Sequence, residues 1–197
     1  MCRLDFGDDD FAFYRICDEL GILVWQDFMF ANMDYPVDDE AFRSNIAAEV
    51  TEQLKRLSAH PCVAIYCGNS EIEQQAAMLG MPREIWRNNW FAEQLPDLCQ
   101  RLHPGTHYVP STPCGGVLPF QPETGLTHYY GVGAYLRPIT DVRRSNVKFT
   151  PECLGFSNIP DASTIEAICQ GSHPVMNDPR WKRRVPRDIG AGWDFED

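Results

Sequence analysis

The chain of 197 residues lacks several features that would assign it to a common class of protein. Its apolar runs all fall short of the roughly 18–20 residues that a membrane-spanning helix needs. It has 17 lysines and arginines against 28 aspartates and glutamates, so its net charge of −11 would repel the phosphates of a nucleic acid. The first ten residues hold four acidic side chains and no apolar stretch, which argues against a secretory signal there. We therefore expect a globular protein with no nucleic-acid and no membrane partner.

The usual metal-binding motifs are also missing. The eight cysteines form no Cys-x-x-Cys pair, and neither His-x-His nor His-Glu-x-x-His occurs. His60, Cys62 and Cys67 are close in sequence, but such a spacing is weak support for zinc. Most cysteines sit in apolar runs, where a free thiol packs as a small hydrophobe, and this favours a reducing, cytoplasmic compartment. We expect no metal and no other cofactor.

What the sequence does contain is an alternation of apolar, β-rich runs with helical patterns. Strands are predicted at residues 21–28, 62–69, 107–110, 126–132 and 146–149. Helices are predicted at residues 9–20, 71–79, 82–102 and 161–169, the third with a break at Pro96 and the last with Asp161 or Ser163 as its cap. A further helix is predicted to begin at a cap, Asp38 or Asp39, and to end before Pro61. Alternating strands and helices indicate βα units and a parallel sheet, hence an α/β fold.

Two glutamates follow predicted strands, and they are the sharpest feature of the sequence. Glu71 and Glu152 are 81 residues apart, which gives about 27 residues per βα unit if their strands are three units apart. That repeat is close to the roughly 31 residues of a (β/α)₈ barrel, whose mouth can hold two carboxyl groups on either side of a glycosidic bond. A glutamate after a strand is, however, more often a charge at a helix N-terminus. Spacing alone therefore leaves both interpretations open.

Five blocks of sequence resemble the β-mannosidase group of family 2 glycoside hydrolases, in that family's order. They are LGILVWQDFMFA (residues 20–31), CGNSEIE (67–73), YVPSTP (108–113), HYYGV (128–132) and ECLGFSNIP (152–160). The second resembles the family's Gly-Asn-Asn-Glu-Asn-Glu element. The last is similar to its final block, although Pro151 and Cys153 replace the usual neighbours of the glutamate. The ordered set implies a clan A catalytic barrel.

This resemblance implies a role for each glutamate. Glu71 corresponds to the family's general acid/base and Glu152 to its nucleophile, in a retaining mechanism with a covalent glycosyl-enzyme. Asn69 matches a position that contacts the sugar near its 2-hydroxyl. The chemistry requires Glu71 to hold a proton near neutral pH while Glu152 is ionised.

Further candidates for the sugar site follow the same strands. Trp25 and Asp27 end one strand, with core packing as the alternative for Trp25 and positioning of neighbours as the alternative for Asp27. His128 is either a substrate contact or a satisfied histidine at a strand end. Tyr129 or Tyr130 is expected to hydrogen-bond Glu152, with wall packing as the alternative.

The resemblance implies an incomplete (β/α)₈ TIM barrel, with about strands three to seven in residues 1–197 and without the family's flanking β-sandwich domains. The predicted function is a retaining β-mannosidase acting on a carbohydrate substrate. The alternatives are another family 2 exo-glycosidase (β-galactosidase, β-glucuronidase or exo-β-glucosaminidase) and a carbohydrate-binding barrel without turnover. A carboxyl separation of about 5–5.5 Å would fit retention and about 6.5–9.5 Å inversion. With the rest of the barrel as its missing partner, the chain alone is expected to be unstable or inactive, because parallel strand edges would be exposed.

Overall fold

The computed structural model describes residues 2–4, 11–155 and 161–170. The chain divides into two compact units, residues 1–155 and 156–197. In the second unit the structure describes helix α7 (Ala162–Cys169) and the residues that flank it. Asp161 is its N-cap, since the Asp161 carboxylate accepts a hydrogen bond of 2.8 Å from the Thr164 N–H. The predicted helix is confirmed, and the cap is Asp161 rather than Ser163.

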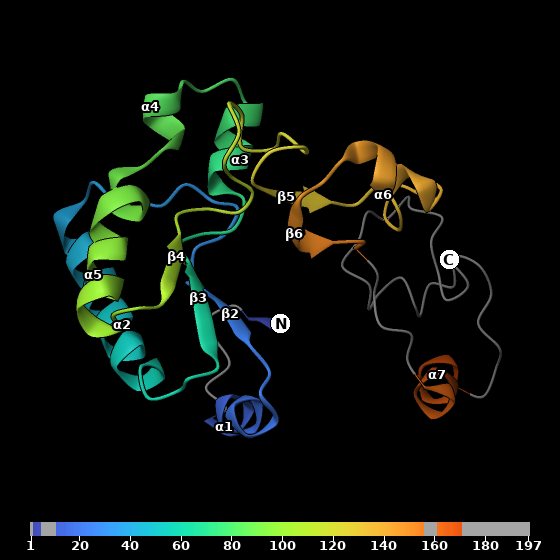
Figure 1. Cartoon of the computed structure of the whole chain (residues 1–197), viewed down its shortest axis with the longest axis horizontal. Coiled ribbons are helices and arrows are strands. Elements are labelled where there is room, and N and C mark those ends of the chain that lie inside the picture. The colour runs from blue at the N-terminus through green and yellow to red at the C-terminus, as the bar shows by residue number, and fades with distance from the viewer. Residues whose placement is uncertain (1, 5–10, 156–160, 171–197) are drawn as a thin grey trace. The chain divides into compact units, whose positions relative to one another are not determined.

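Four parallel strands form the main sheet of the first unit, in the order β1-β2-β3-β4 (Figure 1). They are β1 (Cys2–Leu4), β2 (Val24–Asp27), β3 (Val63–Cys67) and β4 (His107–Val109). Helices α1 (Phe11–Leu20) and α2 (Glu40–Leu57) each connect one strand to its neighbour, as in successive βα units. The α/β class is as predicted. Strand β1 was not predicted, because three residues beside an acidic run give no readable periodicity.

A second sheet pairs β5 (Leu126–Tyr129) with β6 (Phe149–Cys153), again in parallel. The short helix α6 (Thr140–Ser145) lies between them in sequence and was not predicted. An antiparallel bridge from Cys114 to Leu126 connects the long loop after β4 to β5. The strands that the structure describes thus form two sheets that do not close into a barrel.

The predicted helix at residues 82–102 is three helical segments. They are α4 (Arg83–Trp86), the π-helical turn η1 (Trp90–Gln94) and α5 (Leu95–Leu102). The predicted break at Pro96 is wrong: the interruption falls at residues 87–89, and the helical backbone continues from η1 directly into α5, which contains Pro96. The turn before Pro96 is π-helical, with the Leu95 N–H donating to the Trp90 carbonyl five residues back. Across the described ranges, no helix is both long and apolar enough to cross a bilayer.

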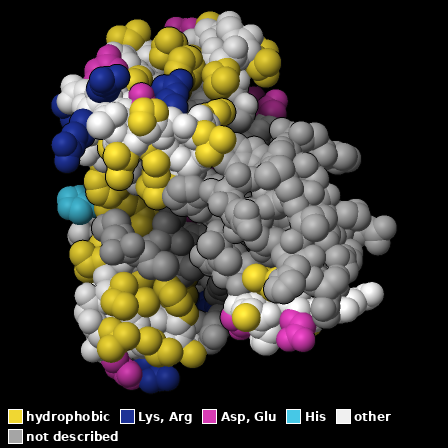
Figure 2. Space-filling view, turned by 90° about the vertical axis from the view of Figure 1, so that its right-hand side faces the viewer, with side chains coloured by type: hydrophobic (Ala, Val, Ile, Leu, Met, Phe, Trp, Pro, Cys, Tyr) yellow, Lys and Arg dark blue, Asp and Glu magenta, His cyan; other side chains and the backbone are white. Residues whose placement is uncertain are grey.

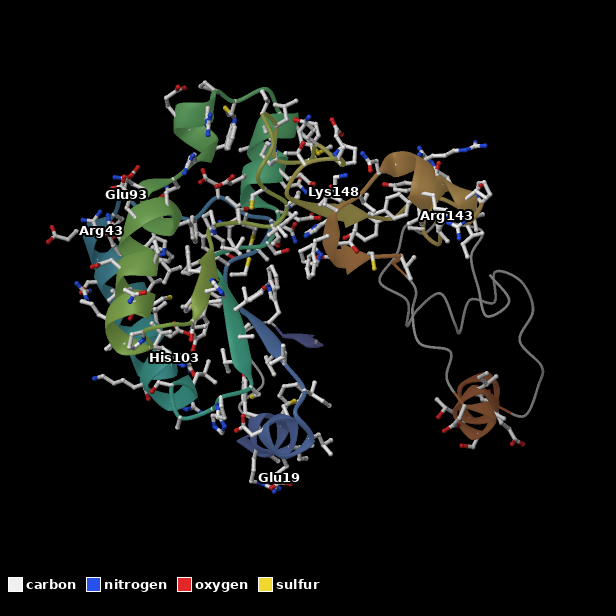
Figure 3. All side chains as sticks on the ribbon, viewed as in Figure 1. Glu19, Arg43, Glu93, His103, Arg143 and Lys148 are labelled. Atoms are coloured by element: carbon white, nitrogen blue, oxygen red, sulfur yellow. The ribbon has the colours of Figure 1, made fainter. Side chains whose placement is uncertain are left out.

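Helix α2 shows how the sequence pattern produces the packing. Asp39 caps it by accepting a 2.8 Å hydrogen bond from the Phe42 N–H, as one of the two predicted caps. Its residues Ile46, Val50 and Leu54 recur every four positions and are all buried, so they form one apolar face. Side chains fill the space between the β1–β4 sheet and helices α2 and α5, as Figure 3 shows.

Strand β2 separates the hydrophobic core from the candidate site. Val24 and Phe28 belong to the core, and Gln26 on the same face pairs with Tyr14 of α1. Trp25 and Asp27 alternate with them and therefore point to the opposite face of the sheet. There Trp25 stacks on Phe149 of β6, with ring centroids 5.9 Å apart. The face away from the helices is thus where the two sheets meet.

Candidate active site

Glu71 lies at the junction between β3 and helix α3 (Ile72–Met78). Single β-bridges from Ser70 to Ala31 and to Thr112 prolong the sheet to this point. The Glu71 N–H donates to the Thr112 carbonyl at 2.6 Å, and the residue adopts a left-handed φ of 65°. A non-glycine residue in this conformation is strained, so the surrounding bonds must hold it there. Backbone hydrogen bonds therefore hold the conformation of Glu71 independently of its side chain.

Gly68 explains why this turn needs the sequence that it has. A Cβ at position 68 would lie 2.3 Å from the Tyr108 hydroxyl oxygen and 2.5 Å from the Pro110 carbonyl oxygen. Tyr108 donates that hydroxyl to the Phe91 carbonyl at 2.7 Å, so it has little freedom to move. Only glycine fits, and this lets β4 and its following loop approach the end of β3.

Glu152 lies in β6, opposite His128 of β5. The pairing register advances two residues on β5, from Leu126 to His128, but three on β6, from Phe149 to Glu152. The extra residue is a bulge that accommodates Pro151, which cannot donate a ladder hydrogen bond. The Tyr130 hydroxyl donates a hydrogen bond to Glu152 Oε1. Of the two tyrosines proposed for this contact, the structure has Tyr130.

His128 brings the two glutamates together. Its Nδ1 is 2.6 Å from Glu71 Oε1 and 3.7 Å from Glu152 Oε2. One atom from each of the three side chains lies within 4.8 Å of the other two, which makes them the group in the described part of the chain that could hold a metal ion. The His128 side chain is only 1% exposed, and its Nε2 is buried without a hydrogen-bond partner among the described residues. The predicted strand separation of three units is confirmed, since β4 and β5 lie between β3 and β6 in sequence.

The electrostatics of Glu71 differ from the expectation. The hydrogen bond from His128 holds the pKa of the Glu71 carboxyl below its usual value, although burial opposes this. The expected raised pKa is therefore wrong for this arrangement. Gln75 adds a second, longer bond, from its Nε2 to Glu71 Oε2 at 3.3 Å. It is Glu73, two residues on, whose pKa burial raises to about 7, despite the nearby cations Arg87 and Arg83.

Asn69, Trp25 and Asp27 are buried beside these groups. The Asn69 amide is held at both ends: Nδ2 donates to the Pro110 carbonyl at 3.0 Å, and Oδ1 accepts from Ser111 Oγ at 2.7 Å. The Trp25 indole N–H donates to Asp27 Oδ1 at 2.7 Å. Asp27 therefore fixes the orientation of its neighbour, one of the two roles considered for it.

Tyr129 occupies a different environment from its neighbours. It is buried, and its hydroxyl donates to Asp141 Oδ2 at 2.6 Å. Since successive strand residues point to opposite faces, His128 and Tyr130 share the face of the glutamates while Tyr129 does not. His60 and Cys62, which were considered as weak zinc ligands, both contact Asp18 of α1. His60 Nδ1 lies 2.7 Å from Asp18 Oδ2, and the Cys62 N–H donates to Asp18 Oδ1 at 2.8 Å.

Two contacts of the site were missed from the sequence. Gln75 was missed, although it stands four residues after Glu71 on a helix, where side chains meet. Ser111 was missed because no local pattern shows that its loop returns to Asn69.

Comparisons with known proteins bear on this geometry. No protein-family model matches the chain. β-Mannosidase B of Aspergillus niger is 36% identical over 138 residues, which are 63% of this chain and 16% of that protein. The Thermothelomyces thermophilus β-mannosidase B is 39% identical over 135 residues, 61% of this chain and 16% of that protein. The chain is homologous to part of the β-mannosidases. The resemblance to that group of family 2 glycoside hydrolases is confirmed.

Solved structures agree with this relationship. The crystal structure of β-D-mannosidase from Dictyoglomus thermophilum matches with a TM-score of 0.73 and 37% identity, over 84% of this chain and 21% of that one. β-Glucuronidase 3 of Bacteroides uniformis matches with a TM-score of 0.52 at 19% identity, over 72% of this chain and 17% of that one, which is a likeness of fold alone. This chain thus spans about a sixth of the length of the curated β-mannosidases and adopts the fold of the corresponding part of a β-mannosidase.

Proposed function

We propose that the chain carries the catalytic pair of a retaining β-glycosidase that hydrolyses terminal β-mannosides. The observation behind this is the convergence of Glu71 and Glu152 on His128, with an oxygen of each carboxylate within 4.8 Å of the other. Retaining glycosidases keep their carboxyl groups about 5–5.5 Å apart, whereas inverting ones leave about 6.5–9.5 Å for a water molecule. Homology to the β-mannosidases supports the choice of sugar.

In this proposal Glu152 is the nucleophile. Its side chain is 43% exposed, so the carboxylate can reach an anomeric carbon, while the Tyr130 hydroxyl orients it through Oε1. The oxygen Oε2 stays on the side of His128 and Glu71. Attack by Glu152 forms the glycosyl-enzyme ester and breaks the bond to the leaving oxygen.

Glu71 is the proposed acid/base. Protonation of the leaving oxygen requires a carboxylic acid, and Glu71 is the glutamate whose Oε1 lies 2.6 Å from His128 Nδ1. Glycosylation of Glu152 removes one negative charge next to this pair, which makes it easier for Glu71 to act as base toward water.

The sugar pocket is proposed to include Asn69, Trp25 and Asp27. Both ends of the Asn69 amide are tethered, so it presents a fixed orientation to the 2-hydroxyl region. The buried Trp25–Asp27 pair faces the same side of the sheet as β6. Tyr129, whose hydroxyl is bonded to Asp141, acts in this proposal as a support for β5.

Glu71→Gln and Glu152→Gln test this proposal in the full-length protein with an aryl β-mannoside. Each should lower kcat by several orders of magnitude while the protein stays folded, as checked by circular dichroism. Near-normal rates in either variant would contradict the assignment. A panel of aryl β-galactosides, β-glucuronides and β-glucosaminides in the same assay decides between the sugars.

A second candidate function is sugar binding without turnover. The lowered pKa of Glu71 favours it, because an ionised carboxyl has no proton to give. Under this alternative the unmodified protein binds mannosides but releases no aglycone from them at any pH. In both cases we propose that residues 1–197 are part of one barrel whose remaining strands lie outside this sequence.

A further inference from the structure

Glu71, His128 and Glu152 bring two carboxylates and an imidazole, all of them groups that bind metal ions, to one point. His128 Nδ1 is 2.6 Å from Glu71 Oε1 and 3.7 Å from Glu152 Oε2, and the three ligand atoms all lie within 4.8 Å of one another. Ligand atoms at about 2.0–2.2 Å from a tetrahedral metal ion lie about 3.3 Å from each other. Side-chain shifts of roughly 1 Å are therefore enough for the three atoms to hold one ion.

Neighbouring side chains orient the two carboxylates toward this point. Gln75 Nε2 donates to Glu71 Oε2 at 3.3 Å, and it is the other oxygen, Oε1, that contacts His128. The Tyr130 hydroxyl donates to Glu152 Oε1, and it is again the other oxygen, Oε2, that lies near His128. Hydrogen bonds of this kind are typical of metal sites, because they orient the ligands and raise the affinity for the ion.

His128 supplies the ligand that selects the kind of metal. Its side chain is only 1% exposed, so the surrounding packing holds the imidazole in place. An imidazole nitrogen together with two carboxylate oxygens suits Zn²⁺, whereas Mg²⁺ and Ca²⁺ prefer oxygen ligands alone. Zinc commonly binds three protein ligands and one water molecule, which is the number of ligands that this group offers.

Outside this group, the face of the molecule in Figure 2 offers a cation only scattered charges. The chain has a net charge of −11, which attracts cations in general. On the face that Figure 2 shows, the acidic side chains of the described residues are dispersed among hydrophobic and basic ones. In the ranges that the structure describes, Glu71, His128 and Glu152 are the group whose ligand atoms converge closely enough to hold an ion.

We propose that Glu71, His128 and Glu152 bind one Zn²⁺ ion, and that this ion is a reversible inhibitor of hydrolysis and not a cofactor. The inhibition rests on the proposed function, because zinc engages the two carboxylates that are assigned to catalysis. Zinc takes the place of the proton in the hydrogen bond between His128 Nδ1 and Glu71 Oε1, and that proton passes to the solvent. With zinc bound, Glu152 is no longer a nucleophile and Glu71 has no proton to transfer.

Isothermal titration calorimetry of the full-length protein with ZnCl₂, after dialysis against a chelator, tests the binding. His128→Phe and Glu152→Gln each remove a ligand and should weaken zinc binding by more than about 100-fold. Gln75→Leu removes only a hydrogen-bond partner of a ligand and should weaken it by about tenfold. Glu152 is 43% exposed, so Glu152→Gln tests the proposal even where His128→Phe does not fold. No binding at millimolar zinc, or unchanged affinity in the variants that lack a ligand, would overturn the proposal.

His60→Asn and Cys153→Ser are the matched controls for this titration. His60 is the histidine that lies near two cysteines in the sequence, and its Nδ1 is 2.7 Å from Asp18 Oδ2. Cys153 is exposed and follows Glu152 directly, and a thiol is a good zinc ligand. Both variants should keep the zinc affinity of the unmodified protein. Loss of binding in either of them would place the ion at that residue and would contradict the proposed ligands.

The inhibition is measured with an aryl β-mannoside. Zinc should raise KM and leave kcat unchanged, because zinc and substrate compete for the same two carboxylates, and a chelator should restore the original KM. Magnesium at the same concentration should have no such effect. Zinc that binds without raising KM, or magnesium that inhibits equally, would count against the proposal. If the unmodified protein turns over no mannoside, the proposed function fails, and the calorimetry then judges the zinc site by itself.

Discussion

The two glutamates lie in regions that differ in burial and in backbone hydrogen bonding. Glu71 ends a strand in the middle of the four-stranded sheet, its side chain is 16% exposed, and backbone bonds from the β2 and β4 sides hold the turn around it. Glu152 is 43% exposed and lies in one strand of a two-stranded sheet whose outer residues Phe149 and Cys153 are exposed. The region that holds Glu71 is therefore fixed by its own core, whereas the region that holds Glu152 depends mainly on β5, Tyr130 and the Trp25–Phe149 stack.

The largest effect should come from removing the two carboxylates in turn. Glu152→Gly should lower kcat by roughly 10⁴–10⁶-fold, because covalent catalysis is lost. Glu71→Gly should lower it by roughly 10²–10⁴-fold with a poor leaving group, and far less with 2,4-dinitrophenyl β-mannoside, which needs no proton.

Azide separates the roles of the two glutamates by stereochemistry. With Glu71→Gly it should intercept the glycosyl-enzyme and yield the β-mannosyl azide. With Glu152→Gly it should replace the nucleophile and yield the α-mannosyl azide, as distinguished by proton NMR. The reverse pattern would show that the two assignments are exchanged.

The next largest effect concerns the free energy of unfolding and compares the packing of α2 with that of β6. Leu54 of α2 is fully buried, so Leu54→Ala should lower the free energy of unfolding by about 2–5 kcal/mol. Phe149→Ala removes a ring that is 46% exposed and stacked on Trp25, and should cost at most about 1.5 kcal/mol. Urea unfolding followed by tryptophan fluorescence measures both. Equal losses would mean that β6 is as firmly packed as α2.

A smaller effect is expected on the pH dependence of catalysis. Because the hydrogen bond from His128 lowers the pKa of Glu71, the acid form is lost as pH rises through that lowered value. His128→Phe removes the bond, so the alkaline limb of kcat/KM should move to higher pH. The pH dependence of kcat/KM, measured for the unmodified protein and for His128→Phe, tests this prediction. An unmoved limb would mean that His128 acts only as a structural support, and Tyr129→Phe, on the other face of β5, is the control that should leave the limb in place.

The smallest predicted effect lies at the other end of β3. Burial would raise the pKa of Asp18, but hydrogen bonds from Cys62 and His60 bring it below its usual value. A lowered pKa in the folded state contributes stability above the unfolded pKa of about 4, and this contribution is lost as pH falls through the folded value. Asp18→Asn should therefore cost about 1 kcal/mol near pH 6 and almost nothing near pH 2.5. Urea titrations at both pH values measure the difference, and a loss of equal size at both would exclude a role for the charge.

Local sequence patterns were sufficient for helix α2 and for strands β2, β3 and β4. The apolar spacing of Ile46, Val50 and Leu54 predicted α2, and Asp38 or Asp39 was predicted as its cap, because helix periodicity and capping act over a few residues. The apolar runs that became β2 and β3 were equally clear. Strand β1 and helix α6 were missed because they are too short to show a period. Pro96 was misread because the helix continues through it after the π-helical turn η1, which no local pattern shows.

By itself, the sequence determined the parallel α/β units, the ordered β-mannosidase blocks and the candidates Glu71 and Glu152. The tertiary structure alone decided that His128 bonds Glu71, that Tyr130 rather than Tyr129 bonds Glu152, and that Glu71 has a lowered pKa. The physical reason is the distance along the sequence over which each interaction acts. Periodicity, caps and turns are set by neighbours in the chain, whereas hydrogen bonds and burial at this site join residues 22 and 57 positions apart, which only the folded sheets bring together.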